Sequence, residues 1–424
     1  MSKEREAGDG PHRDAKRDEM QQGGAARCRV CGGGPLHRWV HLPDMPLTEE
    51  LHPPAHAGKP FLADIDVYVC EACGVSQTVG MRDLSPYYID YGYTVGQSAF
   101  ASLFMERLAV AVRDRYGLKP GFSVVEIGSG DGVQLKSFER AGARVYGVEP
   151  SASLCQASRA RGIPVMEALF EPATAALLPE AFRSADVLLL TYTFDHLPDP
   201  SGMLEAARQT LHPGRGLLVL EVHDLDQIVE RREYCLFEHE HYTYWTKETL
   251  KGALGRCGFR MLTSELLPAS QRRGNSLLIV AAPMDAAHVP DGRAEADRIG
   301  TTIDYSGFQT ELDSGIAALD AFVAAESAAG RKVAGYGGGG RGVMTLAAMS
   351  TAGQIAYVCD ANKALHGRLA PKSQVPVVDI ARLAEQPVDT LIVFSYGYMA
   401  EIQEAVRKQP NAPQRIVSML ELLK

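Results

Sequence analysis

The strongest constraint on the fold is an alternation of short β-rich runs with amphipathic helical segments, which occurs twice along the chain. The first series contains apolar runs at 123–127, 143–149, 185–192, 215–222, 259–267 and 276–282. The second contains runs at 332–337, 355–360, 375–379, 389–396 and 415–419. Strands that alternate with helices predict doubly wound α/β sheets. We therefore expect two α/β domains, of which the second is smaller.

The segments around these two series complete the predicted organisation. At 424 residues the chain is too long for one compact core. Residues 1–24 are charged and rich in glycine, which predicts a disordered tail. Apolar positions at helical spacing in 309–330 predict a linking helix. The expected domains are a metal-stapled module at 25–85, the larger α/β domain at 86–285, a linker at 286–330 and the smaller α/β domain at 331–424.

Composition narrows the class of protein. Hydrophobic residues make up 46% of the chain and charged residues 22%, as in ordinary soluble globular proteins. A net charge of -9 argues against nucleic acid as the main partner. We find no apolar run that could span a bilayer and no signal-peptide core at the start of the sequence. These features predict a cytoplasmic protein without a membrane partner, present as a monomer or a weak homodimer.

Four of the eight cysteines form two CxxC pairs, 28-CRVC-31 and 70-CEAC-73. In a cytoplasmic chain, cysteines are expected as thiols or metal ligands rather than as disulfides. One CxxC turn supplies two thiolates, so two turns complete a tetrahedral zinc site. The alternative is two chance pairs of free thiols. Because a four-thiolate set leaves no open position, the predicted zinc is structural, with the ligands Cys28, Cys31, Cys70 and Cys73.

A glycine-rich turn follows the first strand of the larger series, in 123-SVVEIGSGDG-132. Glycines let the backbone approach a ligand closely, and the next helix offers free amides. Glu149 ends the following strand, where an acid can hold both hydroxyls of a ribose. Flavin and nicotinamide domains use the same device, so the turn alone leaves a dinucleotide ligand open.

The spacing in this turn differs from the usual dinucleotide pattern and resembles motif I of class I S-adenosylmethionine-dependent methyltransferases. The segments 186–200 and 211–222 are similar to that family's fourth strand and its L-x-P-G-G turn, with Arg215 in place of a glycine. The resemblance implies a Rossmann-like methyltransferase domain that binds S-adenosylmethionine. It implies cofactor contacts from Tyr93, Glu126, Gly128, Ser129, Gly130, Gly132, Glu149 and Tyr192. A domain-junction core is the alternative role for Tyr93 and its neighbour Tyr91.

The order of the parts resembles the sugar C-methyltransferases, which methylate C3 of deoxyamino 4-keto sugars carried on thymidine diphosphate. In the last domain, 335-GYGGGGRG-342 is similar to the family's GYGA-x-x-KG turn, and 357–377 is similar to its D-x-N-x-x-K-x-G stretch. The resemblance implies that these tracts bind a nucleotide sugar. It implies substrate contacts from Tyr91, His239, Tyr244, Gly337, Arg341, Asp360, Lys363 and Tyr396. The alternative for the glycine tract is a turn that merely joins a strand to a helix.

The segment 236-LFEHEHYTYWT-246 resembles the family's Y-H-E-H-x-S-Y-F-S segment. The resemblance implies that His241 is a general base, with Glu240 as its orienting partner. C-methylation beside a ketone needs a base within reach of the carbon proton. It also needs a donor or a cation close to the ketone oxygen. A packing histidine is the alternative for His241, and a metal bound by His239 and His241 lacks a third ligand at a suggestive spacing.

The sequence departs from the family at three places in the expected substrate pocket. Glu238 stands where the family has a tyrosine, and a carboxylate can donate to an enolate oxygen only when it is protonated. The family's N-V-x-A-H loop is reduced to His196, and its W-N pair near the C-terminus is replaced by 395-SYGY-398. These changes suggest a different acceptor, still compatible with a nucleotide sugar. The candidate catalytic residues are His241, Glu240, Glu238 and His196.

Three hypotheses about function follow. The first is a C-methyltransferase that removes a proton beside the ketone of a nucleotide-activated keto deoxysugar and transfers a methyl group to the resulting carbanion. The second keeps the fold and has His241 serve O- or N-methylation of another small metabolite. The third is a cofactor-binding partner protein whose altered pocket has lost its chemistry.

Overall fold

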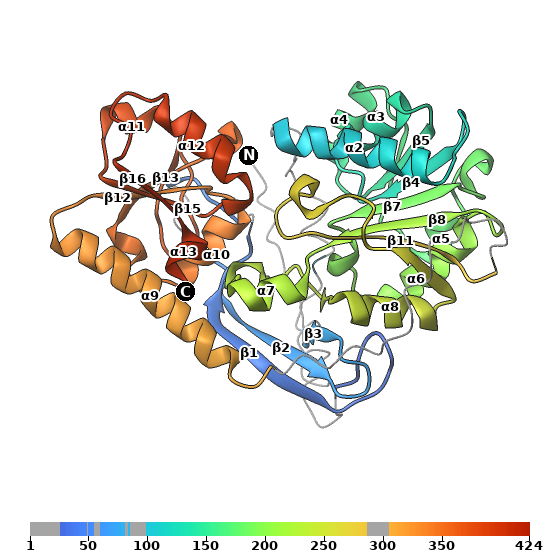
Figure 1. Cartoon of the computed structure of the whole chain (residues 1–424), viewed down its shortest axis with the longest axis horizontal. Coiled ribbons are helices and arrows are strands. Elements are labelled where there is room, and N and C mark those ends of the chain that lie inside the picture. The colour runs from blue at the N-terminus through green and yellow to red at the C-terminus, as the bar shows by residue number, and fades with distance from the viewer. Residues whose placement is uncertain (1–25, 49, 55–59, 81–83, 85–98, 286–304) are drawn as a thin grey trace, which may run out of the picture.

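Three β-sheets organise the chain (Figure 1). The structure is a computed structural model that describes residues 26–48, 50–54, 60–80, 84, 99–285 and 305–424. The sheets contain four, seven and five strands. The seven-stranded and five-stranded sheets correspond to the two predicted α/β series, which confirms the predicted fold class.

The seven-stranded sheet has the order β10-β11-β8-β7-β4-β5-β6. The strands from β8 to β6 run parallel, whereas β11 is antiparallel to both β8 and β10. Its strands are β4 (Ser123–Ile127), β5 (Arg144–Glu149), β6 (Val165–Glu167), β7 (Val187–Thr191), β8 (Leu217–Val222), β10 (Phe259–Thr263) and β11 (Leu277–Pro283). The helices around it are α2 (Ala99–Arg115), α3 (Val133–Arg140), α4 (Ala152–Ala160), α5 (Pro172–Ala175), α6 (Pro200–Thr210), α7 (Leu225–Arg231) and α8 (Lys247–Arg256).

Alternate residues of the central strands face opposite cores. Leu188 and Leu190 of β7 belong to a buried cluster that also contains apolar side chains of α6 and α8. Val187 and Leu189 of the same strand belong to a second cluster with α2 and α3. Because both faces of the strand are covered, its sequence is continuously apolar. The sheet therefore has a helical layer on each side.

The N-terminal module forms the four-stranded antiparallel sheet, in the order β1-β2-β3-β9. Its strands are β1 (Leu36–Met45), β2 (Ala63–Cys70), β3 (Ser76–Thr78) and β9 (Thr243–Tyr244). The last of these comes from the segment that contains the candidate base, and its pairing with β3 was not predicted from the sequence. Ser76 pairs with Tyr244 and Gln77 with Thr243. The candidate base segment is thus part of the N-terminal sheet.

The C-terminal part begins with α9 (Phe308–Ala328), at the predicted linking helix. A parallel sheet follows, in the order β14-β13-β12-β15-β16. Its strands are β12 (Val333–Tyr336), β13 (Ile355–Cys359), β14 (Val377–Val378), β15 (Thr390–Val393) and β16 (Arg415–Ser418). Its helices are α10 (Gly340–Ala348), α11 (Arg382–Glu385), α12 (Met399–Arg407) and α13 (Met419–Leu422).

One buried core joins the N-terminal sheet to this C-terminal part. Trp39 and Val40 of β1 share a cluster with Leu312 of α9 and Met344 of α10. Trp39 also stacks on Tyr305, with ring centroids 3.9 Å apart. In Figure 1, β1 and β2 lie below the two α/β units and α9 runs beside β1. This core holds the C-terminal sheet opposite the seven-stranded sheet.

Within the described ranges, no helix is both long enough and apolar enough to cross a membrane.

Candidate active site

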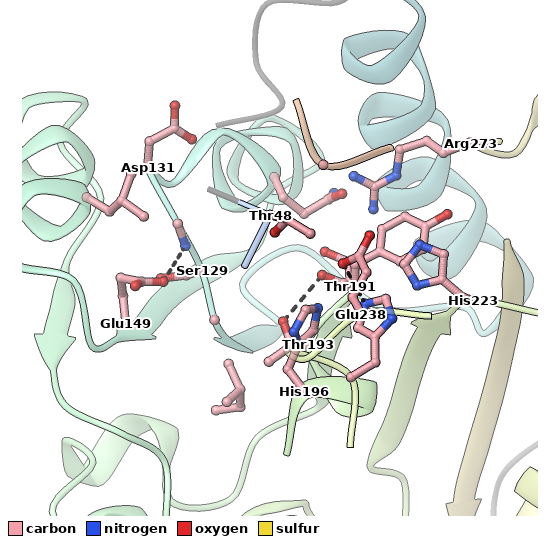
Figure 2. Close-up of a pocket in the computed structure, with 18 of the residues that line it drawn as sticks. Thr48, Ser129, Asp131, Glu149, Thr191, Thr193, His196, His223, Glu238 and Arg273 are labelled. Atoms are coloured by element: carbon pink, nitrogen blue, oxygen red, sulfur yellow. Dashed lines mark hydrogen bonds and ion pairs between the residues drawn. The ribbon is translucent and has the colours of Figure 1, made fainter. Parts of the chain in front are cut away.

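A cavity of about 910 Å³ lies between the seven-stranded sheet and the C-terminal domain. Both glycine-rich turns line it, together with part of the 236–246 segment and Thr48 of the N-terminal module. In Figure 2, Asp131, Ser129 and Glu149 lie at one end of the view, whereas Glu238, His223 and Arg273 lie at the other. The cavity therefore joins the two predicted ligand turns and the candidate base.

The first glycine turn is built to leave its edge open to a ligand. Gly128 has φ +68°, and a Cβ at this position would come within 2.5 Å of the Thr193 hydroxyl. The Gly130 N–H donates to Glu149 Oε2 at 2.9 Å, and the Ser151 N–H donates to Glu149 Oε1 at 2.9 Å. These bonds fix the Glu149 carboxylate beside the turn, at the carboxyl end of β5.

Acidic side chains dominate this end of the cavity. Glu126 is 1% exposed, and its Oε2 atom has no hydrogen-bond partner among the described residues. Burial raises the pKa of Glu126 well above its ordinary value and also raises the pKa of Glu149. Asp131 lines the same end and pairs with Arg161 at 3.1 Å. A cationic ligand would stabilise these acids, and S-adenosylmethionine fits because it carries a sulfonium and an ammonium group.

His241 lies in the wall of the cavity with one ring nitrogen committed. Its Nδ1 atom is 2.9 Å from the Leu236 carbonyl oxygen, which can only accept, so Nδ1 carries the hydrogen. Nε2 is therefore the basic nitrogen of the neutral ring, and it lies 3.6 Å from Glu238 Oε2. The residue is 1% exposed. This tautomer is the one that a general base requires.

Glu238 and His241 form a buried pair whose titrations depend on each other. Burial raises the pKa of Glu238 to about 7, although the facing His241 lowers it. Burial alone would lower the pKa of His241, but Glu238 and Asp195 outweigh this effect and raise it. Near neutral pH the pair can hold one proton. Glu238 can then donate a hydrogen bond while His241 keeps its basic lone pair.

Glu240 and His239 point away from the cavity, toward the N-terminal module. Glu240 Oε1 accepts from the Thr48 N–H at 2.8 Å and from the Thr48 hydroxyl at 2.7 Å. The Leu236 carbonyl, not Glu240, takes the Nδ1 hydrogen of His241. His239 Nε2 lies 2.9 Å from the Met45 carbonyl oxygen. In an extended segment, alternate residues such as His239 and His241 would be expected to face the same way. This expectation is wrong, because residues 239 and 240 form a turn.

Three polar residues of this site were not found from the sequence, namely His223, Asp195 and Arg273. His223 lines the cavity, and its Nδ1 atom lies 2.9 Å from Asp195 Oδ2. The His196 and His223 rings lie 4.7 Å and 4.9 Å from the His241 ring. Burial lowers the pKa of His196 to about 3 and that of His223 to about 4, so both are neutral at neutral pH. The third missed residue is Arg273, which forms a buried ion pair with Glu221.

Asp195 is the carboxylate that interacts with His196, His223 and His241. Burial alone would raise the pKa of Asp195, but the hydrogen bond from His223 and the neighbouring His196 and His241 hold it well below its ordinary value. Their positions in the sequence could have identified Asp195 and His223 as site residues. Both lie just after the carboxyl ends of β7 and β8, where ligands of α/β sheets bind. Asp195, His196 and His241 also present possible metal-ligand atoms within 4.8 Å of one another. The fold thus places Asp195 and His196 beside His241 as possible metal ligands, which the sequence around His241 does not contain.

The C-terminal glycine turn repeats the geometry of the first one. The Gly338 N–H donates to Asp360 Oδ2 at 2.6 Å, and the Asn362 N–H donates to Asp360 Oδ1 at 2.7 Å. Gly337 has φ +100°, and a Cβ there would overlap the Ser395 side chain. Gly339, Gly340 and Arg341 line the cavity at the start of α10. The turn presents a helix N-terminus to the cavity, where anions bind readily.

Arg341 is the cationic group of this second turn. Its guanidinium carbon lies 5.1 Å from the centroid of the Tyr396 ring. Its Nε atom is buried without a hydrogen-bond partner among the described residues. Burial alone would lower the pKa of Arg341, but neighbouring groups, among them Tyr396 and Glu233, raise it. A buried guanidinium in this state is ready to bind an anionic ligand.

The structure separates the predicted site residues into two groups. The cavity wall contains Glu126, Gly128, Ser129, Gly130, Glu149, Tyr192, His196, Glu238, His241, Arg341 and Asp360. The residues that do not line it are Gly132, His239, Glu240, Tyr244, Gly337, Lys363 and Tyr396. Tyr91 and Tyr93 lie outside the described residues.

The remaining predicted residues differ in their surroundings. Gly132 precedes α3 at φ +80°. The Tyr244 hydroxyl accepts from the Glu238 N–H at 3.2 Å, and it lies 3.3 Å from the Glu238 carbonyl oxygen, to which it can donate. The Tyr192 hydroxyl donates to the Asn275 carbonyl oxygen at 2.8 Å, while its ring packs on His223. Lys363 is exposed in a short turn.

The four paired cysteines converge as a zinc site requires. Cys28 Sγ lies 3.6 Å from Cys73 Sγ, and Cys31 Sγ lies 3.7 Å from Cys70 Sγ. Tetrahedral zinc with four thiolates places its sulfur atoms about 3.8 Å apart. Gly32 and Gly74 follow the two pairs with positive φ, as the tight turns require. Four thiolates at this spacing fit a structural zinc ion.

Comparison with known proteins identifies the parts of the chain. Family models match residues 28–84 as a zinc binding domain, residues 100–264 as a methyltransferase domain and residues 274–420 as a C-methyltransferase C-terminal domain. The C-methyltransferase NovU of Streptomyces niveus is 27% identical over 88% of this chain and 90% of its own. An uncharacterized methyltransferase of Mycobacteroides abscessus is 32% identical over 28% of this chain and 43% of its own.

One solved structure resembles part of the chain. The PH0226 protein of Pyrococcus horikoshii is 19% identical, with a TM-score of 0.37, over 47% of this chain and 98% of its own. The family matches and the site together identify an S-adenosylmethionine-dependent methyltransferase with a structural zinc module and a C-methyltransferase C-terminal domain.

Proposed function

We propose that this C-methyltransferase, related to NovU, acts on a nucleotide-activated keto sugar, with His241 as the base that removes a proton from the carbon beside the ketone. The observation that carries the proposal is the state of His241, whose Nδ1 hydrogen is taken by Leu236 and whose basic Nε2 faces the cavity beside Glu238. The full-length similarity to NovU supports carbon as the methylated atom.

The two ends of the cavity suit two ligands of opposite charge. The end with Glu126, Asp131 and Glu149 would hold the cationic cofactor. The end with the α10 N-terminus and Arg341 would hold a diphosphate, with Asp360 near the ribose. A nucleotide sugar held there would extend its sugar toward Glu238 and His241. The departure at position 238 supports an acceptor different from that of the family's tyrosine-bearing members.

The chain's own groups account for the proton. His241 Nε2 would take the proton, and the electrons of the broken C–H bond would form an enolate. Glu238, whose pKa burial raises to about 7, would in its protonated form donate a hydrogen bond to the enolate oxygen. The nearby ionised Asp195 would stabilise the imidazolium that forms. S-adenosylmethionine supplies the methyl group as a sulfonium electrophile.

Isotope exchange at the acceptor carbon tests this proposal. Thymidine-diphosphate-linked 4-keto sugars would be incubated in deuterium oxide with S-adenosylhomocysteine, so that proton removal can occur without methyl transfer. We expect deuterium to enter the carbon beside the ketone in the parent enzyme, and the His241→Gln variant to exchange at least about a thousandfold more slowly. Retention of that carbon's hydrogen through complete turnover of the parent would contradict C-methylation.

O- or N-methylation with His241 as base remains the second candidate function. The same basic Nε2 atom could take a proton from a hydroxyl or an ammonium group. In that case, methylation would proceed while the carbon-bound deuterium of a labelled acceptor is fully retained.

A further inference from the structure

We propose that the cysteine-rich module is a working part of the active site, because Thr48 and Thr78 position the segment that carries His241. This inference rests on the proposed role of His241 as the base. It assigns a positioning role to two residues outside the methyltransferase domain. Zinc in the module would then control proton removal without controlling cofactor binding.

Thr48 ties the base segment to the N-terminal module and to the C-terminal domain. Its N–H and its hydroxyl both donate to Glu240 Oε1, at 2.8 Å and 2.7 Å. Thr48 is 6% exposed, and it lines the cavity. A Cβ at Gly340, in the second glycine turn, would lie 3.5 Å from Thr48 Cβ. The residue therefore stands where the three parts of the chain meet.

Thr78 holds the backbone of the base itself. Its hydroxyl donates to the His241 carbonyl oxygen at 3.2 Å, and its N–H donates to the Tyr242 carbonyl oxygen at 3.2 Å. Thr78 is 1% exposed, so water does not compete for these bonds. The strand pairs between β3 and β9 continue the contact to Tyr244. His241 is thus fixed from the module side by backbone bonds as well as by Thr48.

The zinc ligands are close to the Thr78 contact. Cys73 is followed directly by the turn into β3, which ends at Thr78. Arg29, between Cys28 and Cys31, donates through Nη2 to the Thr78 carbonyl oxygen at 2.8 Å and through Nη1 to the Pro198 carbonyl oxygen at 2.9 Å. Its guanidinium carbon lies 5.1 Å from the centroid of the Tyr242 ring. Metal binding at the four thiolates would therefore hold both Arg29 and β3 in place.

Among the described residues, the hydrogen bonds to the Glu149 carboxylate come from within the methyltransferase domain, although Cys28 and Val75 of the module share a buried apolar cluster with Ile127 beside the cofactor turn. Glu149 is held by Gly130 and Ser151, which belong to the methyltransferase domain. The turn at Gly128 follows β4 in the centre of the seven-stranded sheet. Because the hydrogen bonds at the two ends come from different parts of the chain, removing the bond from Thr48 should displace the base segment and leave the cofactor end intact.

The test compares two threonines with the same bonding pattern. In the C-terminal domain, the Thr351 N–H and hydroxyl both donate to Asp320 Oδ1, at 2.9 Å and 2.6 Å. Thr48→Val and Thr351→Val each remove one hydroxyl donor to a carboxylate. Thr48→Ser keeps the hydroxyl and is the conservative variant. All three would be made in the full-length, zinc-loaded protein.

The first readouts do not require a known acceptor. Amide hydrogen exchange would be followed for residues 238–244, and S-adenosylhomocysteine binding would be measured by calorimetry. We expect Thr48→Val to speed exchange in this segment by about tenfold, because a buried charge-assisted hydrogen bond is lost. Cofactor-product affinity should stay within about twofold of the parent, since that end is independently held. Thr351→Val should change neither quantity.

Activity gives the second readout where an acceptor is turned over. Thr48→Val should lower kcat about tenfold, with KM for S-adenosylmethionine unchanged, and Thr48→Ser should restore it. Unchanged exchange and unchanged kcat in Thr48→Val would overturn the positioning role. Equal effects of Thr351→Val would also overturn the positioning role of Thr48, because any lost threonine–carboxylate hydrogen bond would then have the same consequence. If no acceptor is ever methylated, the proposed function fails. Amide hydrogen exchange at residues 238–244 still shows whether Thr48 positions this segment.

Zinc removal extends the same test to the metal. A chelated sample should lose protection at residues 238–244 and keep S-adenosylhomocysteine affinity. Full protection after complete removal of zinc would contradict the proposal. Simultaneous loss of cofactor-product binding would contradict it as well, since the module would then support the whole fold rather than the base.

Discussion

The two glycine-rich turns share a backbone device and differ in charge. In the methyltransferase domain, the Gly130 N–H donates to Glu149 at the end of β5. In the C-terminal domain, the Gly338 N–H donates to Asp360 just after β13. Around the first turn stand the carboxylates of Glu126 and Asp131, whereas Arg341 stands beside the second. The same turn can therefore serve opposite ligands.

This difference shows that the backbone conformation of such a turn does not by itself determine the charge of the ligand that it binds. An acid bonded to a glycine N–H is common to both ends of the cavity. The side chains next to the turn set the local potential, which in the proposed function would favour a sulfonium cofactor at one end and a diphosphate at the other. Each prediction below changes one end and uses the other end as its internal reference.

Replacing the glycines of the two turns by alanine should have the largest effect on ligand affinity. Gly128→Ala should weaken S-adenosylhomocysteine binding about a hundredfold or more, because the new Cβ meets Thr193 at 2.5 Å and φ +68° is unfavourable for alanine. Gly337→Ala should instead weaken binding of thymidine diphosphate glucose, since its Cβ overlaps Ser395 at φ +100°. Calorimetry with both ligands on both variants checks this reciprocity. Loss of both ligands in either variant would mean that the turns are not independent.

The parts of this comparison that depend on local pattern were predictable from the sequence. Apolar runs of four to eight residues predict strands. The run 143–149 ends in Glu149, so the sequence alone places this acid at the end of a strand. Gly128 and Gly337 follow such runs, which places both turns at the carboxyl edges of their sheets. Opposite charges at the two turns can be read from Glu126 and Arg341 in the same way.

Contacts between distant segments were not predictable. The strands β3 and β9 are three and two residues long, too short for a periodic signal, and they meet only through tertiary packing. Nothing near Glu240 in the sequence indicates that its partner is Thr48 rather than His241. The site therefore contains a predictable part, built on strand ends, and an unpredictable part, built by the N-terminal module.

Arg341→Met should have the next largest effect and should sharpen the charge contrast. Removing the guanidinium should weaken thymidine diphosphate glucose binding about thirtyfold, because hydrogen bonds between charged groups contribute about 2 kcal/mol. The salt dependence of this binding should also decrease. Arg215→Met is a control, because Arg215 pairs with Asp186 at 2.7 Å and does not line the cavity. An unchanged affinity in Arg341→Met would refute the assignment of the second turn to an anion.

The two acids should give smaller and symmetrical effects. Glu149→Gln should weaken S-adenosylhomocysteine binding about tenfold and leave thymidine diphosphate glucose binding unchanged, since an amide is a poorer acceptor for ribose hydroxyls. Asp360→Asn should do the opposite by about the same factor. Titration of each variant with both ligands measures the two effects. If either variant loses the other end's ligand instead, the ribose assignment at that end is wrong.

Glu238→Gln should have the smallest effect at neutral pH and addresses an acid that lies beside the positively charged turn. Its carboxylate faces the anion-binding turn, since a Cβ at Gly340 would lie 3.7 Å from Glu238 Oε1. Burial raises the pKa of Glu238 to about 7, so the Glu238–His241 pair holds more protons below this pH and fewer above it. Thymidine diphosphate glucose has no diphosphate group that titrates near pH 7. Its affinity should therefore fall about threefold as pH rises through 7, because the pair becomes more negative.

In Glu238→Gln the only titrating member of the pair is His241. The anion that raises the pKa of His241 is gone, so this pKa should fall, and the decrease in affinity should move to lower pH than in the parent. Asp195 stays ionised, His196 and His223 stay neutral, and Arg341 stays charged across this range, so they add no competing step. Calorimetry from pH 5.5 to 8.5 measures the shift. An identical pH dependence in parent and variant would show that titration of the Glu238–His241 pair does not control binding at the second turn.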